Sequence, residues 1–195
     1  MKTIAWDVDD TLNNFTQVWF NDWWHLDPKS AELNYSQLTE NPPNRLLGIS
    51  EAAYLASLDA FRTSALAATI SPISHILDWF QCYGEKSRHL ALTATPLNAA
   101  PYSAAWVLKH FGKWIRSYNV IPSKRDGDPL QVHDQNKTEF LDWLGKVDIF
   151  VEDNEANLIS AQRAGYLTIG IPQPWNNVRN SLEDILAQLT TYLDG

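Results

Sequence analysis

Three carboxylates, Asp7, Asp9 and Asp10, lie within four positions near the start of the chain. They follow a short apolar run that is typical of a buried strand. Like charges this close repel one another, so a bound cation or a catalytic role would account for their presence. An acidic turn that caps a helix is the simpler alternative. A calcium-binding EF-hand loop does not fit, because it needs glycine at its sixth position and glutamate at its twelfth, where this chain has Leu12 and Val18.

A second acidic pair, Glu152 and Asp153, also follows an apolar run and precedes a helical segment. In a parallel sheet this second strand can end beside the first, which would bring Asp153 opposite Asp7. Oxygen ligands that converge there suit Mg²⁺, a hard cation that commonly bridges to phosphate. Taken alone, such a pair is more often a helix start favoured by the helix dipole. Together with the first cluster, the pair predicts a metal site.

Two further polar residues stand at the ends of predicted elements. Thr93 follows a buried strand, where threonine also commonly serves turn formation. Lys137 comes one residue after Asn136, the predicted cap of a helix, and so lies at the unfavourable end of the helix dipole. That position is tolerable if the ammonium group faces an anion. An exposed lysine without a special role is the ordinary alternative.

Short apolar runs alternate with longer segments of helical period, which predicts an α/β fold with a Rossmann-like parallel sheet flanked by helices. His89, at the start of a predicted strand, is expected to be a packing or edge residue. The predicted strands are 3–8, 89–93, 114–121, 147–152 and 166–171. The predicted helices are 71–83, 101–112, 136–145, 154–164 and 182–192, which end at or before glycines in four of the five cases.

The connection between the first two strands is far longer than the dozen or so residues that a simple crossover needs. It holds a tryptophan-rich helical stretch, a turn-prone loop at 41–44 and an alanine-rich helix near 50–67. We therefore expect residues 1–11 and 71–195 to form the core and residues 12–70 to form a small inserted helical cap.

The composition narrows the class of protein further. The chain has 195 residues with a net charge of −8, which argues against binding to a nucleic-acid polymer or to an anionic membrane surface. Cys82 is the single cysteine, so no intrachain disulfide can form. No apolar run is long enough for a signal peptide or a membrane span, and we expect a soluble cytoplasmic protein. The oligomeric state does not follow from the sequence.

Taken in this order and on these elements, the motifs resemble those of the haloacid dehalogenase-like superfamily of phosphohydrolases. The resemblance spans nearly the whole chain, and the inserted helical segment lies where members with a type-1 cap carry theirs. It implies a haloacid dehalogenase-like core and a phosphate ester of a small molecule as substrate. The matching residues are Asp7, Asp9 and Thr11, then Thr93, then Lys137, then Glu152 and Asp153, with Asn157 following.

The resemblance implies a role for each matching residue. Asp7 would attack phosphorus and form an aspartyl-phosphate, and Asp9 would act as general acid and then general base. The catalytic Mg²⁺ would be held by Asp7, Asp153 and the backbone carbonyl of Asp9. Thr93 and Lys137 would hold the phosphate oxygens, although Lys124 is an alternative to Lys137. Glu152 and Asn157 would support these groups from behind.

Several alternatives stay open within the superfamily. Members that act as dehalogenases do not need the second aspartate, so Asp9 favours phosphate chemistry and a Mg²⁺-dependent phosphomonoester hydrolase. A phosphomutase would keep the same core residues and differ in how its cap excludes water. A non-catalytic descendant that binds phosphate or a partner protein would lack Asp7, Asp9 or Asp153, and all three are present.

The aromatic residues of the predicted cap bear on the substrate. Phe15 matches an aromatic residue of the 5'(3')-deoxyribonucleotidase branch, to which the chain has a weaker resemblance, and Trp19 and Trp23 follow at helical spacing. The three could form a wall for a nucleobase, which would make the substrate a nucleoside monophosphate. They could equally pack the cap against the core. The chain also departs from that branch, with Asp10 where glycine is usual and Asn154 where a basic residue often stands.

Overall fold

A computed structural model describes residues 1–24, 33–123, 125 and 131–194 of the chain. Its centre is a five-stranded sheet in the order β3-β2-β1-β4-β5, in which every neighbouring pair is parallel. The strands are β1 (Thr3–Trp6), β2 (Arg88–Thr95), β3 (Ile115–Pro122), β4 (Ile149–Glu152) and β5 (Leu167–Gly170). The first strand therefore lies in the middle of the sheet, between β2 and β4.

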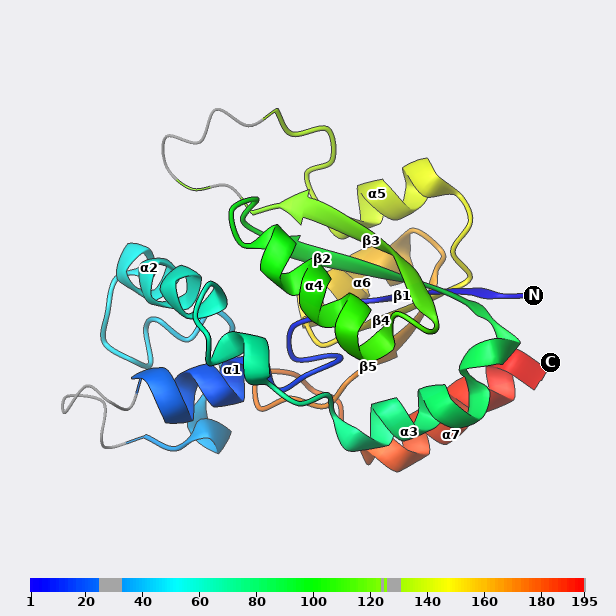
Figure 1. Cartoon of the computed structure of the whole chain (residues 1–195), viewed down its shortest axis with the longest axis horizontal. Coiled ribbons are helices and arrows are strands. Elements are labelled where there is room, and N and C mark those ends of the chain that lie inside the picture. Colours follow the sequence, from blue (N-terminus) through cyan, green and yellow to red (C-terminus); the bar gives the residue numbers. More distant parts are fainter. Residues whose placement is uncertain (25–32, 124, 126–130, 195) are drawn as a thin grey trace.

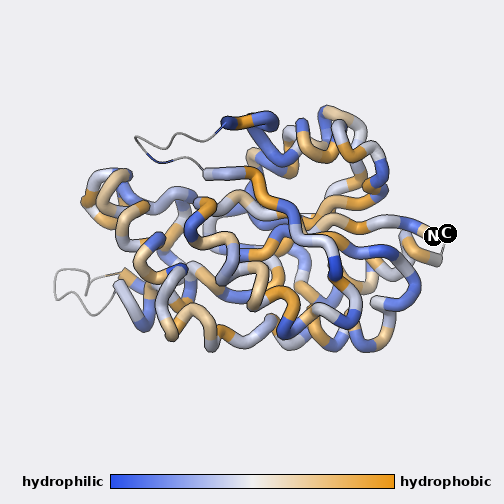
Figure 2. The backbone as a smooth tube through the Cα atoms, turned by 45° about the horizontal axis from the view of Figure 1, so that its top comes forward, coloured by the Kyte–Doolittle hydropathy of each residue, from blue (hydrophilic) through white to orange (hydrophobic). Residues whose placement is uncertain are grey.

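Helices cover both faces of this sheet (Figure 1). One face packs against α3 (Ser74–Tyr83), α4 (Ala100–Phe111) and α7 (Leu182–Asp194), and the other packs against α5 (Lys137–Leu144) and α6 (Glu155–Arg163). Because β1 and β4 are buried on both faces, they are almost continuously apolar, and orange segments run through the middle of the tube in Figure 2. The predicted Rossmann-like α/β fold is confirmed.

The predicted elements differ from the observed ones mainly at two helix ends. The alanine-rich helix expected near 50–67 is α2 (Glu51–Arg62), which ends five residues early, and one helix starts late. The sequence places that start at Ser71, whereas α3 begins at Ser74. Pro72 instead pairs with Asn13 in an isolated antiparallel bridge. The backbone N–H of the next residue, Ile73, donates to the carbonyl of Leu12 at 3.0 Å. The chain before α3 is therefore held beside the chain that leaves β1.

Two asparagine side chains cap the N-termini of α5 and α6, the helices that bring polar residues to the edge of the sheet. The Asn136 side chain accepts a hydrogen bond from the backbone N–H of Glu139 and so begins α5. The Asn154 side chain accepts from the N–H groups of Ala156 and Asn157 and so begins α6. Such caps satisfy N–H groups that the first helical turn leaves without partners. Both helices therefore begin directly at the carboxyl edge of the sheet.

The long connection after β1 is helical and builds a hydrophobic cluster of its own. We call residues 14–70 the cap segment; in Figure 1 its blue and cyan helices lie at one end of the molecule. Its described residues form α1 (Phe15–Val18), a π-helical turn (Trp19–Trp23), α2 (Glu51–Arg62) and the short 3₁₀ turns Tyr35–Gln37 and Ala67–Thr69. Leu12, which the sequence analysis assigns to the cap, packs in the main core instead.

Among the described residues, no helix combines the length and the apolar character that crossing a membrane requires.

His89 is a buried histidine whose ring nitrogens both have partners. The Trp6 indole N–H donates to Nδ1 at 3.0 Å, so Nε2 carries the ring proton and donates to the Gly84 carbonyl at 2.8 Å. Burial lowers the pKa of His89 from 6.5 to about 4, although the hydrogen bond to Gly84 opposes the shift. The folded protein therefore excludes a proton that the unfolded chain accepts.

We expect the contribution of His89 to stability to be present above about pH 6.5 and to be lost as the pH falls to about 4. The whole shift corresponds to roughly 3 kcal/mol in the free energy of unfolding. Urea unfolding at neutral pH and near the lower pKa, on the wild type and on His89→Gln, isolates this contribution, because glutamine keeps a donor and an acceptor but does not titrate. The same pH dependence in both proteins would contradict the assignment.

Candidate active site

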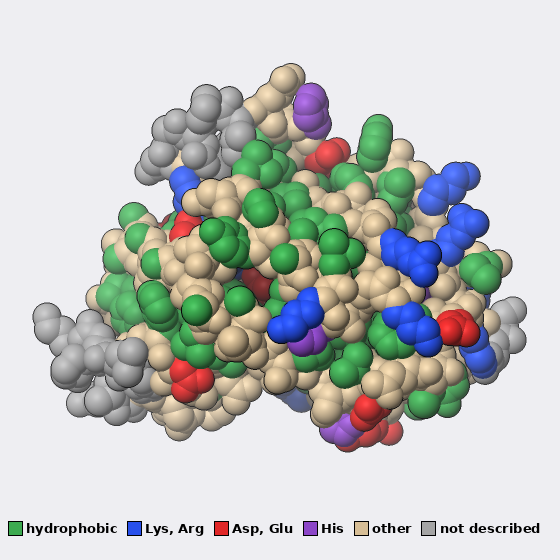
Figure 3. Space-filling view, in the orientation of Figure 1, with side chains coloured by type: hydrophobic (Ala, Val, Ile, Leu, Met, Phe, Trp, Pro, Cys, Tyr) green, Lys and Arg blue, Asp and Glu red, His purple; other side chains and the backbone are tan. Residues whose placement is uncertain are grey.

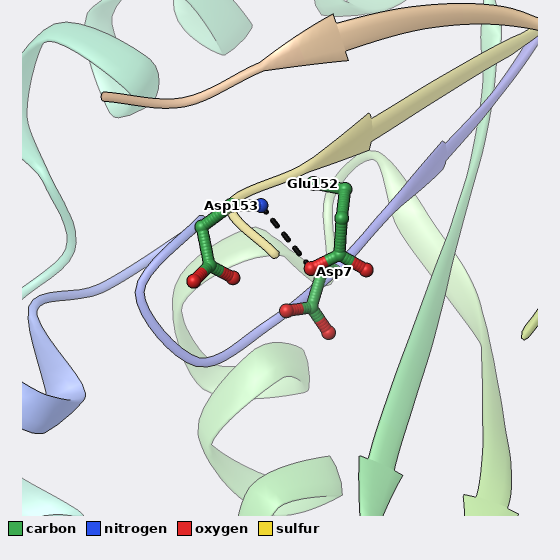
Figure 4. A group of neighbouring side chains, drawn as sticks. All are labelled: Asp7, Glu152 and Asp153. Carbon is green, nitrogen blue, oxygen red and sulfur yellow. Dashed lines mark hydrogen bonds between the residues drawn. The ribbon is translucent and has the colours of Figure 1, made fainter. Parts of the chain in front are cut away.

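The pairing of β1 with β4 brings the two acidic clusters together. Trp6 is in register with Val151, and the Asp7 N–H continues the pairing by donating to the Val151 carbonyl at 2.9 Å. Carboxylate oxygens of Asp7, Glu152 and Asp153 consequently lie within 4.8 Å of one another (Figure 4). All three residues are buried. Within the described part of the chain, this is the one such group of potential metal ligands.

A single lysine ties this cluster together. Lys137 begins α5 and is only 4% exposed, and its ammonium nitrogen lies 2.6 Å from Asp7 Oδ1 and 2.7 Å from Glu152 Oε2. Burial disfavours the charged lysine, but the two carboxylates hold its pKa above its ordinary value. The lysine that the sequence predicts to face an anion therefore faces two carboxylates directly. Lys124, the alternative, lies outside the described residues.

Glu152 has hydrogen-bond partners on both carboxylate oxygens. Oε1 accepts from the N–H groups of Asp153 and Asn154, each at 3.1 Å, and Oε2 accepts from the Asn157 side chain at 3.1 Å as well as from Lys137. Although burial acts to raise it, the pKa of Glu152 lies below its ordinary value because Lys137 and these donors stabilise the anion. Glu152 therefore positions Lys137 and the start of α6.

The other two carboxyl groups of the cluster, those of Asp7 and Asp153, have raised pKa values. Burial and the charge of Glu152 raise the pKa of Asp7 to about 8, although Lys137 opposes the shift. Burial and the same glutamate hold the pKa of Asp153 well above its ordinary value. Lys137 thus supplies too little positive charge for three buried acids, and a hard cation bound by Asp7 and Asp153 would meet the deficit.

Asp153 is oriented by a segment that the sequence analysis does not single out. The Trp175 indole N–H donates to Asp153 Oδ2 at 2.8 Å, and the Asn176 side chain donates to its backbone carbonyl at 2.8 Å. Both residues follow β5, the neighbour of β4 in the sheet. No local pattern marks them, because their role depends on the spatial pairing of β4 with β5.

Asp9 and Asp10 point to the cap segment rather than to the acidic cluster. Asp9 Oδ2 accepts from Arg62 at the end of α2, at 2.9 Å. Asp10 has φ of +60°, which explains why glycine is usual at this position in the resembling branch. Its carboxylate accepts from the Thr16 backbone N–H at 2.8 Å, and its carbonyl accepts from the Gln173 side chain at 2.7 Å. The third carboxylate of the first motif is therefore structural.

The predicted substrate aromatics divide between the cavity and the cap interior. Phe15 lines the cavity, whereas Trp19 is fully buried in the cap cluster and Trp23 packs on Phe61 with ring centroids 5.8 Å apart. The aromatic wall thus reduces to Phe15. The guanidinium carbon of Arg62 lies over the Phe15 ring, 4.9 Å from the ring centroid. The ring centroids of Phe15 and Phe61 are also 4.9 Å apart.

The described residues enclose a cavity of about 280 Å³ between the cap segment and the carboxyl edge of the sheet. Figure 3 shows a hollow between the cap segment and the core, with an acidic side chain at its floor. Thr93, at the end of β2, is 2% exposed and lines the cavity with the acidic residues. Its lining includes Asp7, Asp9, Phe15, Tyr54, Arg62, Thr93, Arg125, Lys137, Asp153 and Asn157.

This architecture is the haloacid dehalogenase-like fold: a parallel sheet whose central strand ends in the acidic motif, with a helical insertion directly after it. A haloacid dehalogenase-like hydrolase from Streptococcus pneumoniae matches 98% of this chain over 98% of its own, with a TM-score of 0.63 and 10% identity. The resemblance stated from the motifs is therefore confirmed at the level of the fold.

Two other solved structures share the arrangement. A protein from Lactobacillus delbrueckii subsp. bulgaricus, assigned as a phosphoglycolate phosphatase, matches 91% of this chain over 88% of its own, with a TM-score of 0.59 and 12% identity. The hydrolase YfnB from Bacillus subtilis, in a magnesium-bound form, matches 99% over 98%, with a TM-score of 0.54 and 14% identity. No protein-family model and no curated protein matches the sequence.

We expect Mg²⁺ to raise the melting temperature more near pH 8 than near about pH 6, because Asp7 and Asp153 must lose protons to bind a cation. Without the metal, the raised pKa values favour the protonated folded state, so stability falls as the pH rises toward about 8. Thermal unfolding with and without Mg²⁺ at both pH values measures the effect.

In the same assay Asp153→Asn should lose most of the Mg²⁺ response, whereas Asp78→Asn, a matched change at an exposed position of α3, should retain it. An equal Mg²⁺ response in wild type and Asp153→Asn would rule out a metal site at this cluster.

Proposed function

We propose that the protein is a Mg²⁺-dependent phosphomonoester hydrolase that acts on a small organic phosphate through an aspartyl-phosphate intermediate. The observation that carries the proposal is the Asp7 carboxylate: it is buried at the end of the central strand, 2.6 Å from Lys137 and beside Asp153 at the floor of a cavity. A cytoplasmic location belongs to the same proposal and rests on the sequence alone.

In the first step, an Asp7 oxygen attacks phosphorus and the bond from phosphorus to the ester oxygen breaks. Asp9, two residues later in the same loop, gives a proton to the departing alcohol. In the second step, Asp9 takes a proton from water while the water oxygen attacks phosphorus, which releases inorganic phosphate and restores Asp7. Mg²⁺ bound by Asp7, Asp153 and the Asp9 carbonyl would neutralise charge on the phosphoryl oxygens.

Thr93 and Lys137 hold the phosphoryl oxygens in this proposal. Both line the cavity, and Lys137 can turn one of its three N–H donors from Asp7 to the phosphoryl group. Glu152 and Asn157 keep the ammonium group at the site, because Glu152 binds it at 2.7 Å and Asn157 fixes Glu152. The lysine therefore stays charged and oriented while Asp7 changes its bonding.

The substrate is a small phosphate ester rather than a nucleotide. A cavity of about 280 Å³ lies just below the range of roughly 300–1,000 Å³ that is typical of ligand pockets. The Phe15 ring already contacts Phe61 and Arg62 and the residue is only 5% exposed, so little of the ring is left for a nucleobase to stack on. The solved structure assigned as a phosphoglycolate phosphatase supports a small substrate for this fold.

We expect the wild-type protein to release phosphate from small phosphate esters when Mg²⁺ is present and to lose this activity with a chelator. Asp7→Asn should abolish turnover, because an amide is not a nucleophile, while the fold and metal binding stay partly intact. A phosphate-release assay over sugar phosphates, phosphoglycolate and nucleotides makes the measurement. Turnover by Asp7→Asn close to the wild-type rate would overturn the proposed nucleophile.

Asp9→Asn should lower the turnover of alkyl phosphates by about 10²- to 10⁴-fold, the usual worth of general acid–base catalysis. An aryl phosphate such as p-nitrophenyl phosphate should lose less, because its leaving group needs no proton. Comparing kcat for the two substrates in the variant tests the role directly. Equal losses for both would show that Asp9 is not the general acid.

A further inference from the structure

We propose that Arg62 forms a subsite for a second anionic group, so that the substrate is a phosphate ester whose alcohol portion carries a carboxylate or a second phosphate. The proposal rests on the proposed phosphomonoester hydrolase, since it concerns the same cavity. Its basis is the position of this buried arginine, its remaining hydrogen-bond donors and the way its neighbours are already paired.

Arg62 lies on the side of the cavity where the alcohol portion of the substrate leaves. It is the last residue of α2, its side chain is 13% exposed, and it lines the cavity together with Asp7 and Lys137. Its Nη2 donates to Asp9 Oδ2 at 2.9 Å, and Asp9 is the group that protonates the departing oxygen. A charged group two or three bonds beyond that oxygen therefore falls near the guanidinium.

The guanidinium has donors that its present neighbours do not fill. Besides the bond from Nη2 to Asp9, Nη1 lies 3.7 Å from Asp59 Oδ1, which is beyond hydrogen-bond distance. Within the described residues, the buried Nε has no hydrogen-bond partner. A guanidinium offers five N–H donors in a fixed fork, which suits a carboxylate or a phosphate. An anion in the cavity would accept from the Nη groups, because Nε itself is shielded from the cavity.

Asp59 lies at ion-pair distance from Arg62, but both of its carboxylate oxygens accept hydrogen bonds from Arg125. Arg125 Nε donates to Asp59 Oδ2 at 2.6 Å, and Nη2 donates to Oδ1 at 2.7 Å. Arg125 Nη1 binds the backbone carbonyl and hydroxyl of Ser123. Among the described residues that line the cavity, the third cation is Lys137, which serves the phosphoryl group. Arg62 is therefore the cation that remains for the rest of the substrate.

Packing fixes the orientation of this arginine before any ligand arrives. Its guanidinium carbon lies 4.9 Å from the centroid of the Phe15 ring, and Phe61 supports that ring from within the cap cluster. A cation held over an aromatic ring in this way loses little conformational freedom on binding an anion. The subsite is thus preorganised, and it selects for charge rather than for an aromatic group.

A matched pair of substrates tests the proposal. 2-Phosphoglycolate and ethyl phosphate are similar in size, and only the former carries a carboxylate on the alcohol portion. With Mg²⁺, the wild type should show kcat/KM for phosphoglycolate at least about tenfold above that for ethyl phosphate. In Arg62→Gln this ratio should fall close to one, whatever happens to the absolute rate on ethyl phosphate. Ethylene glycol bisphosphate shows whether a phosphate occupies the subsite better than a carboxylate.

Two further variants complete the design. Arg62→Lys keeps the charge but not the planar fork, so it should lower the ratio of kcat/KM for phosphoglycolate to that for ethyl phosphate by several-fold. This variant tests the subsite if Arg62→Gln does not fold. Arg45→Gln removes an exposed arginine of the cap segment and should leave the ratio unchanged. An unchanged ratio in the Arg62 variant that folds, or a wild-type ratio near one, would overturn the subsite.

Failure of the subsite and failure of the proposed function give different results. If the wild type hydrolyses ethyl phosphate without preferring phosphoglycolate, the hydrolase stands and the subsite falls. If the wild type hydrolyses neither ester, the proposed function fails, and thermal unfolding with Mg²⁺ and each ester decides the subsite. Stabilisation by phosphoglycolate above ethyl phosphate, lost in Arg62→Gln, would support it, and equal stabilisation would overturn it.

Discussion

The contact of Lys137 with Asp7 and Glu152 is the interaction on which the site depends. An ammonium group that is 4% exposed lies between two buried carboxylates, and each member of this triad would be costly without the others. The contact joins the start of α5 to the ends of β1 and β4, which are far apart in the sequence. The order of the central strands, the cap of α5 and the burial of the site must therefore form together.

The core and the cap segment contribute different kinds of group to the cavity. In the proposed mechanism, the core supplies the groups that act on phosphorus from strand ends and helix starts, which are rigid elements. Two charged side chains of the cap segment line the cavity, Glu51 and Arg62, and an aromatic cluster of the cap holds the cationic one, Arg62. In the proposed function, the reaction thus belongs to the core, and the choice of the alcohol portion belongs to the cap.

Much of this arrangement could be predicted from the sequence, because it follows from elements with strong local signals. Apolar runs that end in acids predict parallel strands whose carboxyl ends meet, and the structure brings Asp7 and Asp153 together there. Arg62 and Trp175 could not be predicted, since their contacts join segments that no local pattern relates. Trp19 was open to two interpretations because helical spacing does not distinguish a cavity wall from the interior of a small cap cluster.

The pairing of Asn13 with Pro72 has a mechanical consequence. The chain enters and leaves the cap segment through two strands of backbone that touch each other, so the attachment is a single narrow neck. Beyond it, charge pairs such as Arg62 with Asp9 and Asp59 with Arg125 join the cap to the core at the cavity. Water can solvate such charges when they separate, whereas the edge-on contact of Tyr35 with Trp175 would expose apolar surface, so the strength of this seam varies along the rim of the cavity.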